Sequence, residues 1–318
     1  MLVFRQIDDP ALSLQASVVT IGNFDGIHLG HQTLVAQTVE AAQRRKAASV
    51  VVTFDPHPLK VLAPERAPRL ILTAEDKIEI LGALGVDVVV RQRFDRAFAN
   101  LRAEEFVRRL VLGRLKTMKM FVGRDLRFGR AREGNVEQLL RWGETLGFDV
   151  SIVEPVLVDG VRVSSSRIRG LVEHGRVEEA RASLGRYHFI SGTVIQGNRR
   201  GRQIGYPTAN IASRTEVIPG DGIYATLFHV DGKWWPSASS IGSNPTFGAG
   251  PRTIESFILD FDEAIYEKPI KLAFVKRIRE EKKFIDVPAL VAQIQDDVEV
   301  TRAVFDEIGY EDKKGAAR

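Results

Sequence analysis

The sequence contains no cysteine among its 318 residues. This excludes disulfide bonds, thiolate metal sites and cysteine nucleophiles, and it is typical of proteins that work in a reducing compartment. No apolar run approaches the roughly 20 residues that a membrane-spanning helix needs, and the first residues lack the pattern of a secretion signal. We therefore expect a cytoplasmic protein that does not act at a membrane.

A strong excess of one charge sign is also missing. The 45 Lys and Arg residues against 41 Asp and Glu give a formal net charge of +4. So small an excess could attract nucleic acid, but it equally suits a protein that handles nucleotide phosphates. With 318 residues and 44% hydrophobic content, the chain is long enough for two domains that each have a core.

Short apolar runs alternate with helical patterns in the first half of the chain. We predict strands at residues 16–21, 49–54, 86–90 and 118–122, and helices at 29–46 and 136–146. Thr73-Ala-Glu-Asp76 resembles a helix N-terminal cap ahead of further apolar positions. Strands separated by helices favour an α/β domain with a Rossmann-like, parallel sheet, whose ligands bind beyond the C-terminal strand ends.

The pattern changes after residue 184. We predict strands at 189–196, 223–230, 234–241, 255–261 and 270–274, which suggests a compact antiparallel β-barrel, followed by a helix at 287–305. Residues 167–184 look helical and would join the halves. The predicted domains are thus an α/β domain at residues 1–184 and a barrel with a terminal helix at residues 185–318.

The most informative segment runs Gly22-Asn-Phe-Asp-Gly-Ile-His-Leu-Gly-His31 and follows the first predicted strand directly. Free N–H groups and the positive dipole end make a helix start a phosphate site. The three-residue spacing lets His28 and His31 reach one phosphate group from the first helical turn. We interpret the segment as a site for the phosphates of ATP, against the alternative of two surface histidines that cap a helix.

A second segment, Ser164-Ser-Ser-Arg-Ile-Arg169, offers three hydroxyls and two guanidiniums at another helix start. Arginine's planar fork suits phosphate oxygens, so this segment could form a second clamp. Taken alone, a serine run is more often a loop and helix cap.

Together the two segments resemble the nucleotidyltransferase superfamily. More narrowly, residues 20–31, 52–58 (Val-Thr-Phe-Asp-Pro-His-Pro) and 121–129 (Phe-Val-Gly-Arg-Asp-Leu-Arg-Phe-Gly) resemble the adenylyltransferase half of the bacterial bifunctional riboflavin kinase/FAD synthetases. The resemblance covers nearly the whole chain. It implies that FMN attacks the α-phosphorus of ATP, which gives FAD and pyrophosphate through alignment and charge stabilisation without a covalent intermediate.

The resemblance also implies roles for single residues of the first half. The catalytic histidines would be His28 and His31, which hold the triphosphate and stabilise the developing charge. The ATP site would further contain Gly22, Asn23, Phe24 and Asp25, with Ser165 and Arg169 on the opposite side. The flavin pocket would be lined by Phe54, Pro56, His57, Pro58, Gly123, Asp125 and Phe128. Ordinary core packing is the alternative for the two phenylalanines.

The second half carries a glycine- and arginine-rich loop from Gly197 that ends in Pro207-Thr-Ala-Asn210. Glycines let N–H groups turn toward phosphates, and a hydroxyl and an amide oxygen are hard ligands suited to Mg²⁺. The Gly-Lys-Ser/Thr ending of a Walker loop is missing, so a plain surface hairpin is an equal alternative. However, Pro207-Thr-Ala-Asn210 resembles the metal-binding signature of riboflavin kinases, and residues 242–248 and 255–261 agree.

By that resemblance Thr208 and Asn210 bind Mg²⁺ with ATP, and Gly197 and Gly201 lie in the ATP site. Glu255 would accept the proton of the riboflavin 5′-hydroxyl as that group attacks the γ-phosphate. Taken alone, Glu255 is a charged residue that faces solvent at a strand start. Three positions depart from the family pattern: Ser166 replaces threonine, Ser240 replaces asparagine and Asn135 replaces an acid.

The expected partners are the small molecules riboflavin, FMN and ATP, with apoflavoproteins as recipients of the flavin. Two alternatives remain open. A transferase for a pantetheine or nicotinamide phosphate would leave Thr208, Asn210 and Glu255 as coincidences. A nucleic-acid-binding barrel would use Arg199, Arg200 and Arg202 with stacking aromatics beside them, for which Tyr206 is the nearby candidate. We expect no nucleic acid partner.

Overall fold

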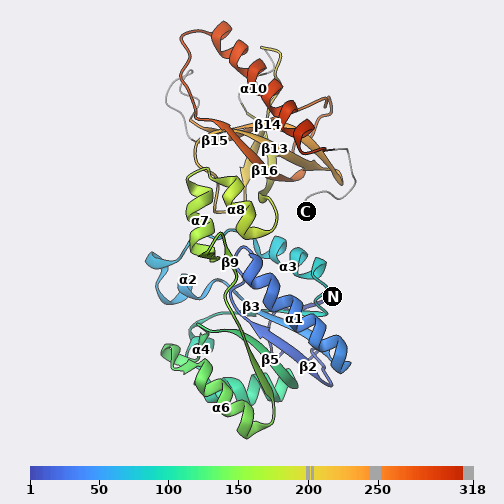
Figure 1. Ribbon diagram of the computed structural model, residues 1–318, viewed down its shortest axis with the longest axis vertical. Helices are drawn as coiled ribbons and strands as arrows, with labels where there is room; N and C mark the ends of the chain where they lie inside the picture. The colour runs from blue at the N-terminus through green and yellow to red at the C-terminus, as the bar shows by residue number, and fades with distance from the viewer. Residues whose placement is uncertain (198–200, 202–203, 244–251, 311–318) are drawn as a thin grey trace. The chain divides into compact units, whose positions relative to one another are not determined.

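The computed structural model describes residues 1–197, 201, 204–243 and 252–310 (Figure 1). The chain divides into two units, one formed by Met1–Arg69 and Ala74–Ser164, the other by Leu70–Thr73 and Ser165–Arg318. We call them the α/β unit and the barrel unit. Residues 165–184 group with the barrel because α8 (Val177–Leu184) packs against barrel strands, so the units divide before the domain boundary that we predicted at residue 184.

Six parallel strands form the sheet of the α/β unit. Their order across the sheet is β1 (Leu2–Phe4), β4 (Val88–Arg93), β3 (Ala48–Asp55), β2 (Ser17–Ile21), β5 (Thr117–Gly123) and β8 (Asp149–Val153). All five residues of β2 are buried, as expected of a parallel strand that is covered on both faces. This confirms the predicted parallel sheet.

The order of the strands reverses beside β2. The chain leaves β2 for β3 and β4 on one side, then returns to β5 on the other side. Ligands of such sheets bind at the carboxyl ends of the strands where the order reverses. The segment from Gly22 to His31 follows β2, and Gly123 ends β5, so both lie at this point of the sheet.

The helices of the α/β unit cover the sheet and connect its strands. They are α1 (Leu29–Arg45), α2 (Pro58–Leu62), η1 (Pro64–Arg66), α3 (Ala74–Ala83), α4 (Arg96–Ala99), α5 (Ala103–Glu105), the π-helix η2 (Phe106–Arg114), η3 (Arg130–Arg132) and α6 (Val136–Leu146). Short strand pairs are formed by β6 (Arg127–Phe128) with β7 (Gly134–Asn135) and by β9 (Leu157–Val158) with β10 (Val161–Arg162). Helix α1 packs on β2, β3 and β5, and Figure 1 shows it alongside the sheet.

The barrel unit begins with α7 (Ser165–Glu173) and α8, which precede a closed antiparallel barrel. The strand order is β11 (His188–Ile195), β12 (Ala209–Ser213), β15 (Thr253–Ile258), β14 (Lys233–Gly242), β13 (Gly222–Val230) and β16 (Pro269–Arg279). The last helix, α10 (Val287–Glu307), packs against β13, β14 and β16. The barrel and its terminal helix are therefore confirmed.

Two sequence predictions need correction. The single helix predicted over residues 167–184 is two helices, because Gly175 adopts a left-handed φ of 74° between them. The strands β1, β8 and β12 were missed. In β12 Ile211 is the one fully buried residue, so its apolar signal is weak. Among the described residues, no helix is long and apolar enough to cross a membrane.

Candidate active sites

The two histidines of the first motif lie together at the start of α1. His28 is the N-cap residue, and its Nδ1 accepts a hydrogen bond of 3.3 Å from the backbone N–H of His31. The two rings are stacked, with centroids 3.7 Å apart and planes 15° apart. Because Nδ1 accepts, a neutral His28 carries its proton on Nε2, which can donate to a ligand. His28 does cap the helix, but its side chain is buried, unlike that of a surface histidine.

The second histidine is held neutral in the ligand-free protein. Burial lowers the pKa of His31 well below its ordinary value, and the neighbouring His28 and Lys77 lower it further. The Nδ1 atom of His31 is buried and makes no hydrogen bond within the described ranges. A buried ring nitrogen without a partner is costly, so this atom is suited to meet a bound ligand or water.

A strained turn joins β2 to α1. Phe24, Gly26 and Ile27 have positive φ angles of 48°, 80° and 37°. Non-glycine residues in this region persist only where the surrounding structure holds them. Here the side chains of Phe24 and Ile27 are fully buried, and Asp25 is 4% exposed. The turn is thus held in place by the burial of its own apolar side chains.

Sequence reasoning missed one charged residue of this site. Lys77 of α3 is buried, and its Nζ donates to the carbonyl oxygen of Asn23 at 2.7 Å. Burial lowers the pKa of Lys77, while Asp25 and Asp55 raise it and Arg91 lowers it slightly further. A lysine within an amphipathic helix pattern gives no local signal of this kind, because its partner lies in another segment of the chain.

The predicted flavin segment after β3 meets the phosphate segment. His57 caps α2, and its Nδ1 accepts from the backbone N–H of Leu59 at 3.2 Å, which leaves the ring proton on Nε2. The amide nitrogen Nδ2 of Asn23 is placed 3.1 Å from that Nε2. Because two donors cannot bond each other, we assign the Asn23 amide the other way round, with its oxygen toward the ring. Asp55 and Pro56 are joined by a cis peptide bond directly before His57.

The two predicted flavin-facing phenylalanines belong to a row of aromatic contacts. Ring centroids are 6.1 Å apart for Phe54 and Phe98, 6.1 Å for Phe98 and Phe106, and 5.7 Å for Phe106 and Phe128. Phe54 and Phe128 are half-buried at the edge of the core. Core packing, which was the alternative to a flavin contact, therefore accounts for one side of each ring. Part of each ring stays exposed.

The remaining predicted flavin residues follow β5. Asp125 is exposed and pairs with Arg162 at 2.8 Å. A Cβ atom at Gly123 would lie 3.2 Å from the Asp125 carboxylate, so the glycine permits a tight turn there. Asn135, where the family pattern has an acid, caps α6 through a reciprocal pair of hydrogen bonds with Gln138.

The predicted second clamp lies on α7 of the barrel unit. Ser165 is the first residue of this helix and Arg169 lies one turn further, so the helix start is confirmed. Their approach to the nucleotide stays a prediction.

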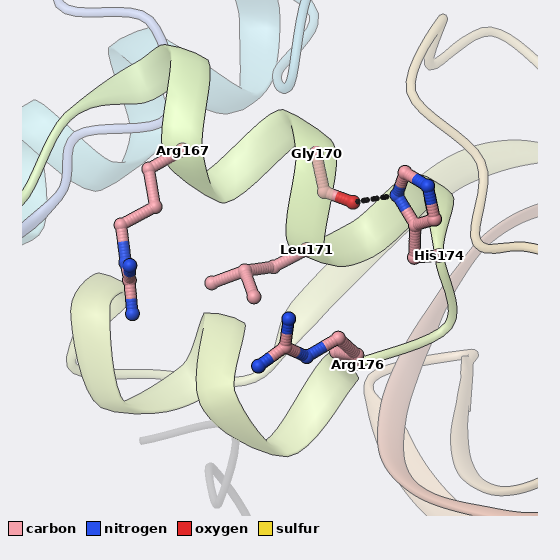
Figure 2. Close-up of a pocket in the computed structure, with 5 residues that line it drawn as sticks. All are labelled: Arg167, Gly170, Leu171, His174 and Arg176. Atoms are coloured by element: carbon pink, nitrogen blue, oxygen red, sulfur yellow. Dashed lines mark hydrogen bonds between the residues drawn. The ribbon is translucent and has the colours of Figure 1, made fainter.

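A surface pocket of about 330 Å³ adjoins the same helix and is lined by Arg167, Gly170, Leu171, His174 and Arg176. Figure 2 shows Arg167 of α7 and Arg176, the residue before α8, on either side of Leu171. His174 Nδ1 lies 2.7 Å from the Gly170 carbonyl oxygen, and Arg176 forms two hydrogen bonds of 2.6 Å with Glu179. The Arg176 charge is thus already compensated, and Ser165 and Arg169 are outside this lining, so the pocket is not the predicted clamp.

The predicted kinase residues converge on neighbouring strands of the barrel. Thr208 Oγ1 donates to Glu255 Oε2 at 3.0 Å, and Asn210 of β12 pairs directly with Glu255 of β15. Ser240 of β14 pairs with Glu255 from the other side. A Cβ atom at Gly197 would overlap the Asn210 side chain, so any larger residue there would displace that side chain. Sequence positions 47 residues apart are therefore brought into contact.

The donor set on these strands fits Mg²⁺. The hydroxyl oxygen of Thr208 and the amide oxygen of Asn210 are hard ligands beside one carboxylate, and Mg²⁺ keeps several waters and nucleotide oxygens in its shell. A cluster of three His, Cys, Asp or Glu residues, as a site made by protein carboxylates would need, is absent from the described residues. The two neutral oxygens beside one carboxylate suit a cation that arrives with a nucleotide.

Some predicted positions fall outside the described residues. These are Arg199, Arg200 and Arg202 of the nucleic-acid alternative and residues 244–248 of the kinase segment predicted at residues 242–248. Tyr206, the stacking candidate, makes an edge contact with Phe257 at 5.3 Å.

Comparison with known families assigns each half of the chain to a family. Residues 11–167 match the family described as FAD synthetase, and residues 184–305 match the riboflavin kinase family. The bifunctional riboflavin kinase/FMN adenylyltransferase of Escherichia coli K12 is 36% identical over 292 residues, which cover 92% of this chain and 93% of that protein. The chain belongs to the bifunctional riboflavin kinase/FMN adenylyltransferase family.

Further members show similar likeness. The Pseudomonas fluorescens member is 36% identical over 90% of this chain and 92% of its own, and the Haemophilus influenzae member is 33% identical over 96% and 99%. A solved structure from Streptococcus pneumoniae, titled a macrolide-efflux protein, superposes with a TM-score of 0.85 at 32% identity and covers 95% of this chain and 99% of its own. Matches over both halves favour a bifunctional enzyme over a transferase that has the N-terminal activity alone, and the roles of Thr208, Asn210 and Glu255 stay predictions.

Proposed function

We propose that this protein makes FAD from riboflavin in two ATP-dependent steps. The barrel unit phosphorylates riboflavin to FMN, and the α/β unit adenylylates FMN to FAD with release of pyrophosphate. The family matches over both halves support both activities. The observation that carries the division of labour is that each unit holds its own set of polar groups, a stacked histidine pair in one and Thr208, Asn210 and Glu255 in the other.

In the kinase step, Glu255 accepts the proton of the riboflavin 5′-hydroxyl while the hydroxyl oxygen attacks the γ-phosphorus of ATP. The Thr208 hydroxyl holds one oxygen of the carboxylate, which keeps Glu255 in place. Because the Thr208 hydroxyl donates its hydrogen to Glu255, the lone pairs of its oxygen can bind a cation. The amide oxygen of Asn210 would bind the same cation. Bound Mg²⁺ would neutralise charge on the phosphate oxygens.

In the adenylyl-transfer step, an FMN phosphate oxygen attacks the α-phosphorus of ATP and the bond to pyrophosphate breaks. His28 donates from Nε2 to a phosphate oxygen, beside the first N–H groups of α1. His31, neutral without ligand, has its pKa raised by the anionic triphosphate, so it gains positive charge where the leaving group develops negative charge. Ser165 and Arg169 would be further donors to the nucleotide.

The remaining assignments place the substrates. The ATP phosphates of the α/β unit would lie along the strained turn before α1, which contains Gly22, Asn23, Phe24 and Asp25. In the barrel unit, ATP would contact Gly197 and Gly201. The flavin of FMN would rest on Phe54, Pro56, His57, Pro58, Gly123, Asp125 and Phe128, with the exposed part of the phenylalanine rings as its apolar surface. The contact between Asn23 and His57 supports this, because it joins the phosphate segment to the flavin segment.

We also propose that the protein works in the cytoplasm, where ATP is available, without nucleic acid as a partner. The FAD that it makes would pass to apoflavoproteins.

The decisive experiment is product analysis after incubation with riboflavin, ATP and Mg²⁺. We expect FMN to appear first and FAD with pyrophosphate to follow, and no product without Mg²⁺. If a folded preparation forms neither FMN nor FAD, the assignment is wrong. If FMN forms from riboflavin while added FMN is never converted, the α/β unit has another acceptor.

A further inference from the structure

Lys77 binds the backbone at the entrance of the strained turn. Its Nζ donates to the Asn23 carbonyl oxygen at 2.7 Å and lies 3.3 Å from Thr53 Oγ1. Thr53 Oγ1 in turn donates to the same carbonyl at 3.1 Å. One carbonyl between β2 and α1 therefore receives two hydrogen bonds, one of them from a cation. Charge-assisted hydrogen bonds are about twice as strong as neutral ones.

A buried ammonium is costly unless its surroundings compensate it. The side chain of Lys77 is 9% exposed, and four ionisable groups from other elements face it. Asp25 of the turn and Asp55 of β3 favour its charged form, while Arg91 of β4 and His31 of α1 oppose it. Arg91 itself forms ion pairs with the carboxylates of Asp55, at 3.5 Å, and Glu75, at 3.6 Å. The charge of Lys77 is therefore sustained by the turn and by the end of β3.

The turn that Lys77 holds has a strained backbone. Each non-glycine residue in the left-handed region costs on the order of 1 kcal/mol, and Phe24 and Ile27 both adopt it. Asn23 directly precedes this stretch, and His28 directly follows it. The position of the Asn23 carbonyl thus fixes where the turn begins and how His28 and His31 are presented.

We propose that Lys77 is a positioning residue of the adenylyl-transfer site, which clamps the Asn23 carbonyl and so sets the placement of His28 and His31. The inference rests on the proposed function of the α/β unit. A consequence follows from its charge. Because Lys77 repels a proton on His31, it helps to keep the histidine pair neutral until an anionic triphosphate binds.

The test compares three variants of the full-length protein. Lys77→Met removes the charge and the donor at similar length, and Thr53→Val removes only the second donor. Lys119→Met is the matched control, since Lys119 is a half-buried lysine of β5 that lies over the Phe121 ring. The measurements are FMN adenylylation as kcat and KM across pH, riboflavin phosphorylation, and the pKa of His31 by NMR titration without substrates.

We expect Lys77→Met to lower kcat for adenylylation on the order of 10²-fold, because a displaced catalytic group costs about that much. Its His31 pKa should rise, and the alkaline side of its pH profile, where His31 loses its proton, should move to higher pH. Thr53→Val should lower kcat less and leave the His31 pKa unchanged. Riboflavin phosphorylation should be unchanged in all three variants, and Lys119→Met should resemble the unmodified protein.

An unchanged kcat together with an unchanged His31 pKa in folded Lys77→Met would overturn the proposal. If Lys77→Met does not fold, Thr53→Val decides: a normal kcat in that variant overturns the clamp. If the unmodified protein does not convert FMN to FAD, it is the proposed function of the unit that fails, while a shifted His31 pKa would still show the coupling to Lys77.

Discussion

At the scale of single residues, His28 has two tasks that can be separated. It caps α1 by accepting from the His31 N–H, and we propose that its Nε2 binds a phosphate. Asparagine can accept the capping hydrogen bond but offers no ring nitrogen to the phosphate. His28→Ala should lose about 0.5–2 kcal/mol of stability and FAD formation, whereas His28→Asn should lose FAD formation alone.

Urea unfolding and product analysis measure the two effects of these substitutions. Both variants should still accumulate FMN from riboflavin. If His28→Asn forms FAD at the normal rate, the imidazole has no part in the reaction.

His188 in the barrel core makes a second prediction at this scale. Its side chain is 1% exposed, its Nε2 lies 3.1 Å from the Val217 carbonyl oxygen, and burial lowers its pKa from 6.5 to about 3. Between pH 6.5 and about pH 3, His188 is therefore protonated in the unfolded chain but neutral in the folded chain. Stability that is present above pH 6.5 is lost as the pH falls through this window, by up to about 1.4 kcal/mol per pH unit.

His188→Gln keeps a donor for Val217 but does not titrate. The free energy of unfolding of this variant should fall less steeply between pH 6.5 and 3 than that of the unmodified protein. His31 contributes to both proteins alike, so the difference in slope reports His188. Equal slopes would contradict the prediction.

At the scale of elements, the loop with β6 and β7 contains two glycines, Gly129 and Gly134, at which an added Cβ atom would overlap Ala103 of α5. A Cβ atom at Gly129 would lie 2.7 Å from the backbone nitrogen of Ala103, and Gly129 has a φ of 73°. The loop carries Phe128, a proposed flavin contact. Gly129→Ala should therefore cost about 1–3 kcal/mol and raise KM for FMN, since overpacking moves the loop.

Gly160 is the matched control for this substitution. It has the same φ of 73° but no neighbour within 4 Å of an added Cβ, so Gly160→Ala carries the backbone strain without the clash. Thermal unfolding and FMN saturation curves compare the two variants. Equal KM values for FMN would show that the clash at Ala103 does not reach the flavin.

Helix α10 is fixed to β16 by a buried ion pair. Arg279 forms hydrogen bonds of 2.8 Å and 2.6 Å with the two carboxylate oxygens of Asp297, whose side chain is 7% exposed. Asp297→Asn leaves the Arg279 charge poorly compensated and should cost about 3–5 kcal/mol. The exposed pair of Arg302 with Asp260 is the control, because Asp260→Asn should cost about 0–1 kcal/mol. Urea unfolding measures both, and similar losses would contradict the argument from burial.

At the scale of the whole molecule, two sites in two units predict two separable activities. Glu255→Gln removes the proton acceptor without changing its size, so FMN formation from riboflavin should fall by about 10²-fold or more. FMN supplied directly should still become FAD at the normal rate. Chromatography of the products measures both steps, with exposed Glu263→Gln as the control. Loss of both activities in folded Glu255→Gln would argue against separate sites.

The sequence was most informative where its signal is local. Buried strands such as β2 and β3 are mostly apolar runs, so their positions were predicted closely. The start of α1 was also predicted closely, because the residues that end β2 and cap the helix are near neighbours in the sequence. The break at Gly175 was missed because a glycine within a helical pattern does not reveal its φ angle.

By itself the sequence determined the class of each half and the family, since periodicity reports which residues are buried and motifs report which groups recur together. The site residues that it indicates stay predictions. Only the tertiary structure decided which distant residues meet. Thr208 reaches Glu255 across 47 positions and Lys77 reaches Asn23 across 54, because strand order and register bring their segments together. Such pairings depend on how elements pack, and a local pattern carries no record of the partner that each element finds.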